Sequence, residues 1–173
     1  MDDPGAIEVR EATAHDAEAL ASLNRIVQDL HRNAMPDVYK ATDLATLARV
    51  FRERFLDPSW HVWLAERADG TPLGYVATLV KPARESPFHR TPARVEVDQL
   101  AVHPNARRRG VGRRLMAVAE GWAEAQGCAG TVLTVIDFNE EALGFYEALG
   151  YHTASRRMTK DLEPRGGDLR HEL

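Results

Sequence analysis

The stretch Val97-Asp-Gln-Leu-Ala-Val-His-Pro-Asn-Ala-Arg-Arg-Arg-Gly-Val-Gly112 places a basic, glycine-containing loop between the end of a strand and the start of a helix. The residues at 94–102 predict a long strand that ends at His103-Pro104. From Gly110 onward, apolar residues recur at helical spacing as far as Gly127, which predicts the following helix. Strand, basic loop and helix therefore form the central unit of the fold.

The physical chemistry of this loop favours an anionic ligand. The first turn of a helix has backbone N–H groups without intrahelical partners and carries the positive end of the helix dipole, so it attracts phosphate oxygens. Gly110 and Gly112 lack side chains and let phosphates approach the backbone closely. The surrounding guanidinium groups add positive potential; they are Arg107, Arg108, Arg109, Arg113 and Arg114. We expect the loop to hold two phosphates.

Other phosphate motifs and another ligand class compete with this interpretation. No Gly-Lys-Ser/Thr follows a first glycine at the spacing of a P-loop, and Leu115 stands where a Rossmann loop requires its third glycine. A surface arginine cluster is usually only a solvated face. Nucleic-acid binding through the arginines is opposed by the net charge of -4, and retention on DNA at moderate salt would favour it.

Strand and helix patterns are mixed along the rest of the chain. Strands are expected at residues 7–10, 60–66, 73–80, 131–136 and 156–162, and the second and third are joined through Asp69-Gly70 as a hairpin. Helices are expected after the capping-box pattern of Thr13 and Asp16, after Asp43, and from Asn139 to a C-terminal Gly150. Residues 81–92 hold three prolines and are expected as a loop.

Length and composition are those of one domain. At 173 residues, roughly 70% of the unfolded chain's surface can be buried in a single core. We expect the domain over residues 1–162 and a flexible tail over 163–173. The first residues carry acids, and no stretch reaches the ~20 apolar residues of a membrane span, which predicts a cytoplasmic protein without a membrane partner. Cys128 is the only cysteine, and the histidines lack metal-ligand spacing, so no metal is expected.

Two blocks carry a family resemblance. The pattern Arg107-x-x-Gly110-x-Gly112 after Leu100-Ala-Val102 resembles the coenzyme A signature of the GNAT superfamily of acyl-CoA-dependent N-acetyltransferases. The block Asn139-Glu-Glu-Ala-Leu-Gly-Phe-Tyr146-Glu-Ala-Leu-Gly150-Tyr151 resembles the later motif of that family, in which an asparagine opens a helix and an aromatic-Tyr pair precedes a Gly-aromatic ending. The similarity is clear over residues 95–151 and compatible over residues 7–80.

The resemblance implies an α+β (mixed α/β) domain with a mixed, mostly antiparallel sheet flanked by helices. Strands 4 and 5 of that sheet, which end at Val102 and Ile136, splay apart, and the pantetheine arm of acetyl-CoA enters the gap. The Leu100 N–H is then a donor to the acetyl carbonyl. The cofactor-binding residues that the resemblance implies are Leu100, Ala101, Val102, Arg107, Arg108, Arg109, Gly110, Val111, Gly112, Arg113, Asn139 and Tyr146.

The resemblance also suggests catalytic residues. Tyr146 would protonate the departing thiolate as general acid, although an aromatic at this spacing can also simply fill space. Glu96 precedes Arg107 by the spacing of the catalytic glutamate in the histone-acetylating branch of the family and is the candidate base. In a strand without a bulge, Glu96 and Asp98 share a face with Leu100. Asp98 or a water chain remain alternatives for the base, as does a structural ion pair of Glu96 with Arg94.

The predicted function is transfer of the acetyl group of acetyl-CoA to a primary amine by direct attack in a ternary complex. A non-catalytic CoA-binding regulatory domain of the same fold is the alternative. The acceptor is a small-molecule or peptide amine, such as a protein N-terminus or lysine, a polyamine, an aminoglycoside or an amino-acid-like xenobiotic. By analogy its pocket lies along the first two helices and the Arg156 region. A homodimer is common in such folds and has no signature in this sequence.

Overall fold

The computed structural model describes residues 6–160. The chain forms two compact units, Met1–Asn139 and Glu140–Leu173. The strands of the first unit are β1 (Ile7–Glu11), β2 (Trp60–Arg67), β3 (Pro72–Lys81), β4 (Arg84–Glu85), β5 (Arg90–Thr91), β6 (Arg94–Val102) and β7 (Thr131–Leu133). Its helices are α1 (Ala17–Ala34), α2 (Leu44–Arg54) and α3 (Val111–Ala125), with the 3-10 turns η1 (Ala14–Asp16) and η2 (Pro104–Ala106). The helix α4 (Glu140–Glu147) belongs to the second unit.

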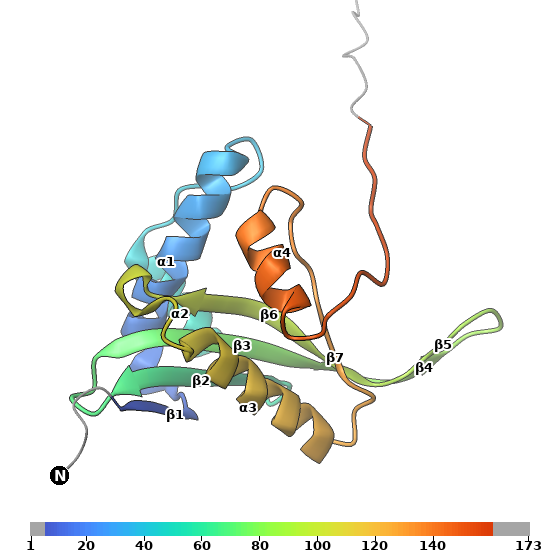
Figure 1. Ribbon diagram of the computed structural model, residues 1–173, viewed down its shortest axis with the longest axis horizontal. Coiled ribbons are helices and arrows are strands. Elements are labelled where there is room, and N and C mark those ends of the chain that lie inside the picture. The colour runs from blue at the N-terminus through green and yellow to red at the C-terminus, as the bar shows by residue number, and fades with distance from the viewer. Residues whose placement is uncertain (1–5, 161–173) are drawn as a thin grey trace, which may run out of the picture. The chain divides into compact units, whose positions relative to one another are not determined.

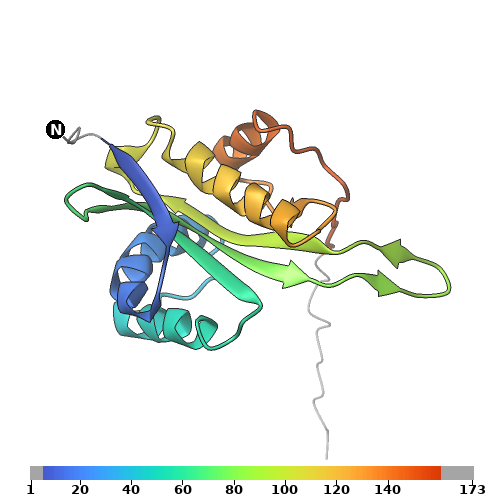
Figure 2. The same ribbon diagram turned by 90° about the horizontal axis from the view of Figure 1, so that it is seen from below.

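A five-stranded sheet in the order β1-β2-β3-β6-β7 is the frame of the first unit (Figure 1). Every neighbouring pair is antiparallel except β6 and β7, which are parallel. Figure 2 shows α1 and α2 on one face of this sheet and α3 on the other. The predicted mixed, mostly antiparallel sheet flanked by helices is therefore confirmed.

Local sequence signals account for most element boundaries. The side chains and backbones of Thr13 and Asp16 form a reciprocal capping box in front of α1. Asp43 caps α2 by accepting a hydrogen bond from the Thr46 N–H at 2.8 Å. Gly70 has φ 81° in the turn that joins β2 to β3, a conformation that residues with a Cβ rarely adopt. These signals were predicted and the structure confirms them.

Apolar side chains fill the space on both faces of the sheet. Under α1 and α2, the core includes the fully buried Leu20, Phe51, Leu64 and Tyr75. The apolar stripe of α3 is buried on the opposite face; it consists of Val111, Leu115, Met116 and Ala119. Burying a large apolar side chain stabilises the fold by about 1.5–3 kcal/mol. The buried stripe therefore holds α3 against the sheet and sets the orientation of its first turn.

Three local predictions were wrong. The expected loop at residues 81–92 contains the short hairpin β4–β5, because Ser86 closes a tight turn: its N–H donates to the His89 carbonyl, and its hydroxyl accepts from the N–H groups of Phe88 and His89. The strand predicted at 131–136 ends at Leu133, where its pairing with β6 stops. No strand forms at residues 152–160, which have no ladder partner within the described chain; residues 161 and 162, and the tail predicted at 163–173, lie outside it.

Candidate active site

The backbone of the loop before α3 is strained. Arg108 has φ 58° and Gly110 has φ 79°. Within residues 6–160, Arg108 is the only residue other than glycine with a positive φ. The left-handed conformation costs about 1–2 kcal/mol for a residue with a Cβ. A turn that contains left-handed residues can direct successive N–H groups toward one point and so form a concave anion site. The strain therefore marks this loop as a candidate binding site.

The N–H groups at the start of α3 are available to a ligand. The first helical hydrogen bond runs from the Arg114 N–H to the Gly110 carbonyl at 3.0 Å. The N–H groups of Val111, Gly112 and Arg113 precede this ladder and have no acceptor in the described part of the chain. The buried Val111 side chain anchors the turn on the sheet, whereas Arg113 is exposed. The predicted anion site thus has fixed donors and a solvent-facing positive charge.

The strands β6 and β7 separate beside this loop. Their pairing covers only Val95 with Thr131, Glu96 with Val132 and Val97 with Leu133. On its other side, β6 stays paired with β3 as far as Val102. The second half of β6 therefore has an open edge toward β7, as the splayed arrangement requires.

The register of β6 decides which groups face that open edge. The His103 N–H donates to the Leu73 carbonyl at 2.8 Å, so this pair is hydrogen-bonded across the ladder with β3. Bonded and non-bonded pairs alternate in an antiparallel ladder, so Ala101 bonds β3, whereas Leu100 and Val102 turn their N–H and C=O groups away from it. Leu100 and Val102 thus present unpaired backbone groups at the open edge. They lie on the same strand that leads into the anion loop.

A β-bulge at Asp98 produces this register and corrects one expectation. Ala77 pairs with Gln99 and Thr78 pairs with Val97, which leaves Asp98 without a partner. The bulge adds one residue, so Glu96 and Asp98 do not share the face of Leu100. The side chains of Asp98 and Gln99 bond Arg54 of α2, and Ala101 packs in the core under α1 and α2. The alternation predicted from the sequence fails here because a bulge has no sequence signal in this strand.

Both candidate bases are paired with cations. Glu96 lies 2.7 Å from the ammonium of Lys81, and not beside Arg94 as the structural alternative held. Asp98 lies 2.9 Å from the guanidinium of Arg54. Desolvation raises the pKa of Asp98 above its ordinary value, while Arg54 opposes the rise. The two carboxylates are therefore charge-balanced by two side chains that sequence reasoning did not identify.

A buried polar network connects α1 with β3 and β6. The Asn24 amide of α1 donates to the Tyr75 hydroxyl at 2.8 Å and to the Gln99 side-chain oxygen at 3.0 Å. Tyr75 and Arg54 also donate to that oxygen. Burial raises the pKa of Tyr75 far above its ordinary value, so the phenol stays protonated and remains a donor. The network holds the bulge in place. An asparagine within an apolar helical stripe, at Asn24, was the only sequence signal for it.

The second unit carries Tyr146. The helix α4 begins one residue after Asn139 and is followed by Gly150, whose φ of 93° agrees with the predicted C-terminal glycine. The Tyr146 ring lies 5.2 Å from Phe145 and 5.7 Å from Tyr151, between ring centroids. Burial, with a smaller effect of Tyr151, raises the pKa of Tyr146 to about 12. The hydroxyl is therefore protonated at neutral pH, as a general acid must be.

Two further features bear on the predicted chemistry. Among residues 6–160, no three side chains of His, Cys, Asp or Glu converge on a point that could hold a metal ion. No helix in the same range is long and apolar enough to cross a bilayer. The absence of a metal and the compartment stay predictions.

Relatives with curated names match this chain over different shares of their length. A probable N-acetyltransferase of Mycobacterium tuberculosis is 31% identical over 58% of this chain and 51% of its own. A mycothiol acetyltransferase of Saccharomonospora viridis is 29% identical over 80% of this chain and 43% of its own. The chain thus spans about half the length of these two relatives. An aminoalkylphosphonate N-acetyltransferase of Salmonella typhimurium is 28% identical over 90% of this chain and 91% of its own.

Solved structures share the fold. The BH1408 protein of Bacillus halodurans, solved as a tetramutant, superposes with a TM-score of 0.85 at 22% identity, over 90% of this chain and 99% of its own. An aminoglycoside N-acetyltransferase in complex with CoA gives a TM-score of 0.71 at 17% identity, over 92% and 96%. A transcriptional regulator of Bacillus halodurans gives 0.70 at 21% identity, over 91% and 100%. The family model of the acetyltransferase (GNAT) family matches residues 24–151, and the chain therefore belongs to this family.

Proposed function

We propose that the chain is an N-acetyltransferase that moves the acetyl group of acetyl-CoA to a primary amine by direct attack. The observation that carries the proposal is that unpaired donors occur both at the open edge of β6 and in the first turn of α3, which one loop connects. An amide-rich pantetheine arm can replace the missing strand beside Leu100 and Val102, and a diphosphate can accept from the N–H groups of Val111, Gly112 and Arg113. No protein group in residues 6–160 competes for these donors.

Leu100 and Glu96 serve the chemical step in this proposal. The Leu100 N–H donates to the acetyl carbonyl oxygen, where negative charge grows as the amine nitrogen bonds to the carbonyl carbon. An amine at neutral pH is mostly ammonium and must first lose a proton. Glu96 lies four residues before Leu100 on β6, about 13 Å at strand spacing, and takes this proton through water. Asp98 is nearer along the strand and is the alternative acceptor of the proton.

Tyr146 completes the reaction. When the carbon–sulfur bond breaks, the electron pair stays on sulfur, and the phenol of Tyr146 gives its proton to the thiolate. With its pKa raised to about 12, the hydroxyl is protonated before the step and can donate to the departing sulfur, although the same rise makes it a weaker acid than an ordinary tyrosine. Asn139, at the start of α4, contacts the cofactor through its amide in the same proposal. No covalent acyl-enzyme is formed, and CoA and the amide are the products.

The acceptor is proposed as a small-molecule or peptide amine. Two of the relatives are named for mycothiol and for an aminoalkylphosphonate, both small molecules. The helices α1 and α2 and the acids of β6 lie on the same face of the sheet, which supports an acceptor pocket there. Because Lys81 and Arg54 balance Glu96 and Asp98, these acids do not by themselves favour a cationic acceptor.

A panel of amines with acetyl-CoA, followed by release of free thiol, tests the proposal. We expect turnover with at least one amine. In Tyr146→Phe, kcat should fall while the Kd of acetyl-CoA stays within about twofold, because the hydroxyl acts only as sulfur departs. Tight cofactor binding without turnover on any amine would contradict catalysis and support the non-catalytic CoA-binding domain instead.

A further inference from the structure

A cavity lies beside the first turn of α3, on the side of β1, β2 and β3 rather than at the gap between β6 and β7. Its volume is about 230 Å³. Apolar residues from four elements and arginines from three places in the sequence line it. These residues are Ile7, Leu73, Ala106, Val111, Arg67, Arg109 and Arg114.

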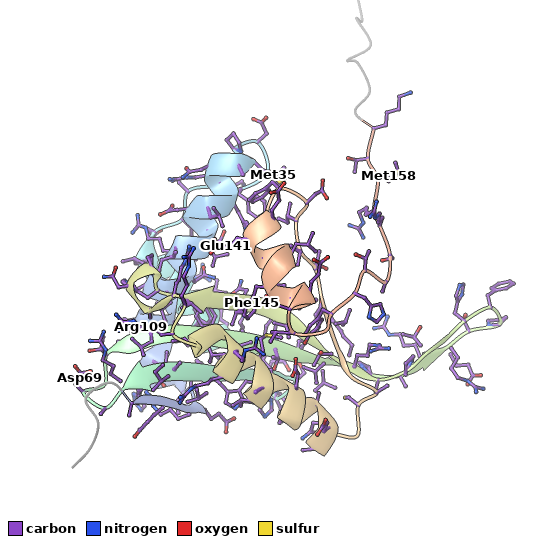
Figure 3. The ribbon with its side chains drawn as sticks, in the orientation of Figure 1. Met35, Asp69, Arg109, Glu141, Phe145 and Met158 are labelled. Atoms are coloured by element: carbon purple, nitrogen blue, oxygen red, sulfur yellow. The ribbon has the colours of Figure 1, made fainter. Side chains whose placement is uncertain are left out.

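The fold brings these arginines together from separate elements. Arg67 pairs with Ile7 at the shared end of β2 and β1. Arg114 comes from α3, and its Nη1 donates to the Ile7 carbonyl at 2.9 Å, which ties the helix to the edge strand. Arg109 comes from the loop before α3; Figure 3 labels it at the same end of the sheet as Asp69, which lies in the turn after β2.

Positive charge in this cavity is poorly compensated. No carboxylate lines it. Arg67 and Arg109 make no ion pair within residues 6–160, and Arg114 donates to the neutral carbonyl of Ile7. Asp69 is close enough to Arg67 for the cation to help lower its pKa, but the main cause is its hydrogen bonds from Thr71. Arg109 and Arg114 are exposed and Arg67 is half-buried, so solvent screens part of their mutual repulsion, and an anion in the cavity would complement the positive potential that remains.

We propose that this cavity binds a small phosphate-bearing anion at the same time as the CoA site is filled. A guanidinium group matches the oxygens of a phosphate in a two-point geometry, and three of them can surround one tetrahedral anion. The cavity is smaller than the roughly 300–1,000 Å³ of pockets that enclose drug-sized ligands, which suits inorganic phosphate or a short phosphate ester. This inference goes beyond the proposed acetyl transfer and does not depend on turnover.

Thermal unfolding with inorganic phosphate tests the inference on the full chain. Phosphate is added at constant ionic strength with CoA already saturating, so the site at the start of α3 is blocked. At ten times the dissociation constant, we expect the Tm to rise by about 3–5 °C. Arg67→Gln should abolish at least about two thirds of this rise. Arg67 lies outside the proposed CoA site, and Arg49→Gln, which removes the same charge from the exposed face of α2, should keep the whole rise.

The variants and CoA separate the competing explanations. A rise that is equal in wild type, Arg67→Gln and Arg49→Gln would reflect a general salt effect and would overturn the proposal. A rise seen without CoA but lost at saturating CoA would overturn it as well, because phosphate would then occupy the cofactor site. If Arg67→Gln unfolds, titration of phosphate into Arg114→Gln followed by ³¹P line broadening gives the same test: broadening equal to that of wild type would count against the cavity.

Discussion

At the scale of single residues, Arg10 pairs with two carboxylates at once. Its guanidinium contacts both oxygens of Asp16, at 2.8 and 3.0 Å, and both oxygens of Glu66, at 2.9 and 3.1 Å. Asp16 also accepts from the Thr13 N–H. The side-chain hydrogen bond from Arg10 is the main cause that lowers the pKa of Asp16 to about 2. This group connects β1, β2 and the start of α1.

Arg10→Ala should therefore reduce stability in a pH-dependent way. The pKa of Asp16 is lower in the folded state than its ordinary value of 3.8, so its stabilisation is complete above about pH 4 and is lost as the pH falls through about 2. Because these ion pairs lie near the surface, we expect a loss of about 1 kcal/mol at pH 7. Urea unfolding should show a difference between wild type and Arg10→Ala that shrinks between pH 4 and pH 2. A difference that is constant across this range would contradict the assignment.

Glu96, the proposed base, gives a second prediction for a single residue. If Glu96 removes the proton of the amine, Glu96→Gln should lower kcat by about 100-fold or more at pH 7. The loss should become smaller as the pH approaches the pKa of the amine, because a growing fraction of the acceptor then needs no base. Steady-state kinetics over pH 7 to 10 measure this change. Glu85→Gln is the matched control, since Glu85 lies on the β4–β5 hairpin and pairs only with Arg90.

If the loss of kcat in Glu96→Gln does not vary with pH, the role of Glu96 is structural and lies in its ion pair with Lys81. If Asp98→Asn instead shows the pH-dependent loss of kcat that is expected for Glu96→Gln, Asp98 is the base.

At the scale of elements, the contact of β3 with β6 depends on one glycine. A Cβ at Gly74 would lie 2.6 Å from the Ala101 carbonyl oxygen and 3.2 Å from Val111. The Ala101 backbone and the Val111 side chain of α3 would both have to move, so Gly74→Ala should destabilise the fold by about 1–3 kcal/mol. The matched control is Gly121→Ala in α3, where nothing lies within 4 Å; it should stabilise by up to about 1 kcal/mol. Equal Tm values for the two variants would contradict this packing.

A carboxylate in the first turn of α3 should have different effects on stability and on CoA binding. Gly112→Asp places a carboxylate in the first helical turn, where it complements the helix dipole, so stability should stay the same or rise by a few tenths of a kcal/mol. The same carboxylate would repel a diphosphate and compete for the N–H groups, so the Kd of CoA should rise by about 100-fold or more. Gly121→Asp adds the same charge nine residues further along α3. The Kd of CoA for Gly121→Asp should equal the Kd for wild type.

Much of the fold was predictable at this scale because short-range signals set it. Thr13 with Asp16, Asp43 and Gly70 specify caps and a turn through groups within four residues of one another. The end of β7 at Leu133 and the bulge at Asp98 depend instead on partner strands, so no local pattern marks them. The hairpin β4–β5 is closed by the Ser86 side chain, and the prolines of the segment concealed it.

The candidate site was predictable in its backbone parts and only partly in its side chains. The Arg-Gly loop and the second half of β6 were found from the sequence, because glycine spacing and strand order are local features. Lys81 reaches Glu96 and Arg54 reaches Asp98 from other elements, and Asn24 and Tyr75 donate to the neighbouring Gln99; only the folded sheet brings these side chains together. The arginines of the cavity beside α3 are likewise separated in sequence by up to 47 residues, from Arg67 to Arg114.

At the scale of the whole molecule, the proposed acetyl transfer depends on backbone donors that bind the diphosphate of the ligand, and not on net charge. The chain carries -4, so attraction of an anion has to be local. The family model covers residues 24–151, which include the open edge of β6, the anion loop and α4. Cofactor binding is therefore the property on which acetyl transfer rests.

Calorimetric titration of the full chain with CoA, and in parallel with pantetheine, measures this property most directly. The two ligands share the amide-rich arm, and only CoA carries the diphosphate. We predict one CoA per chain with a Kd at least about 100-fold below that of pantetheine, equivalent to roughly 2.7 kcal/mol. Equal affinity for the two ligands, or no heat with CoA, would contradict the assignment of the N–H groups of Val111, Gly112 and Arg113 as the diphosphate site.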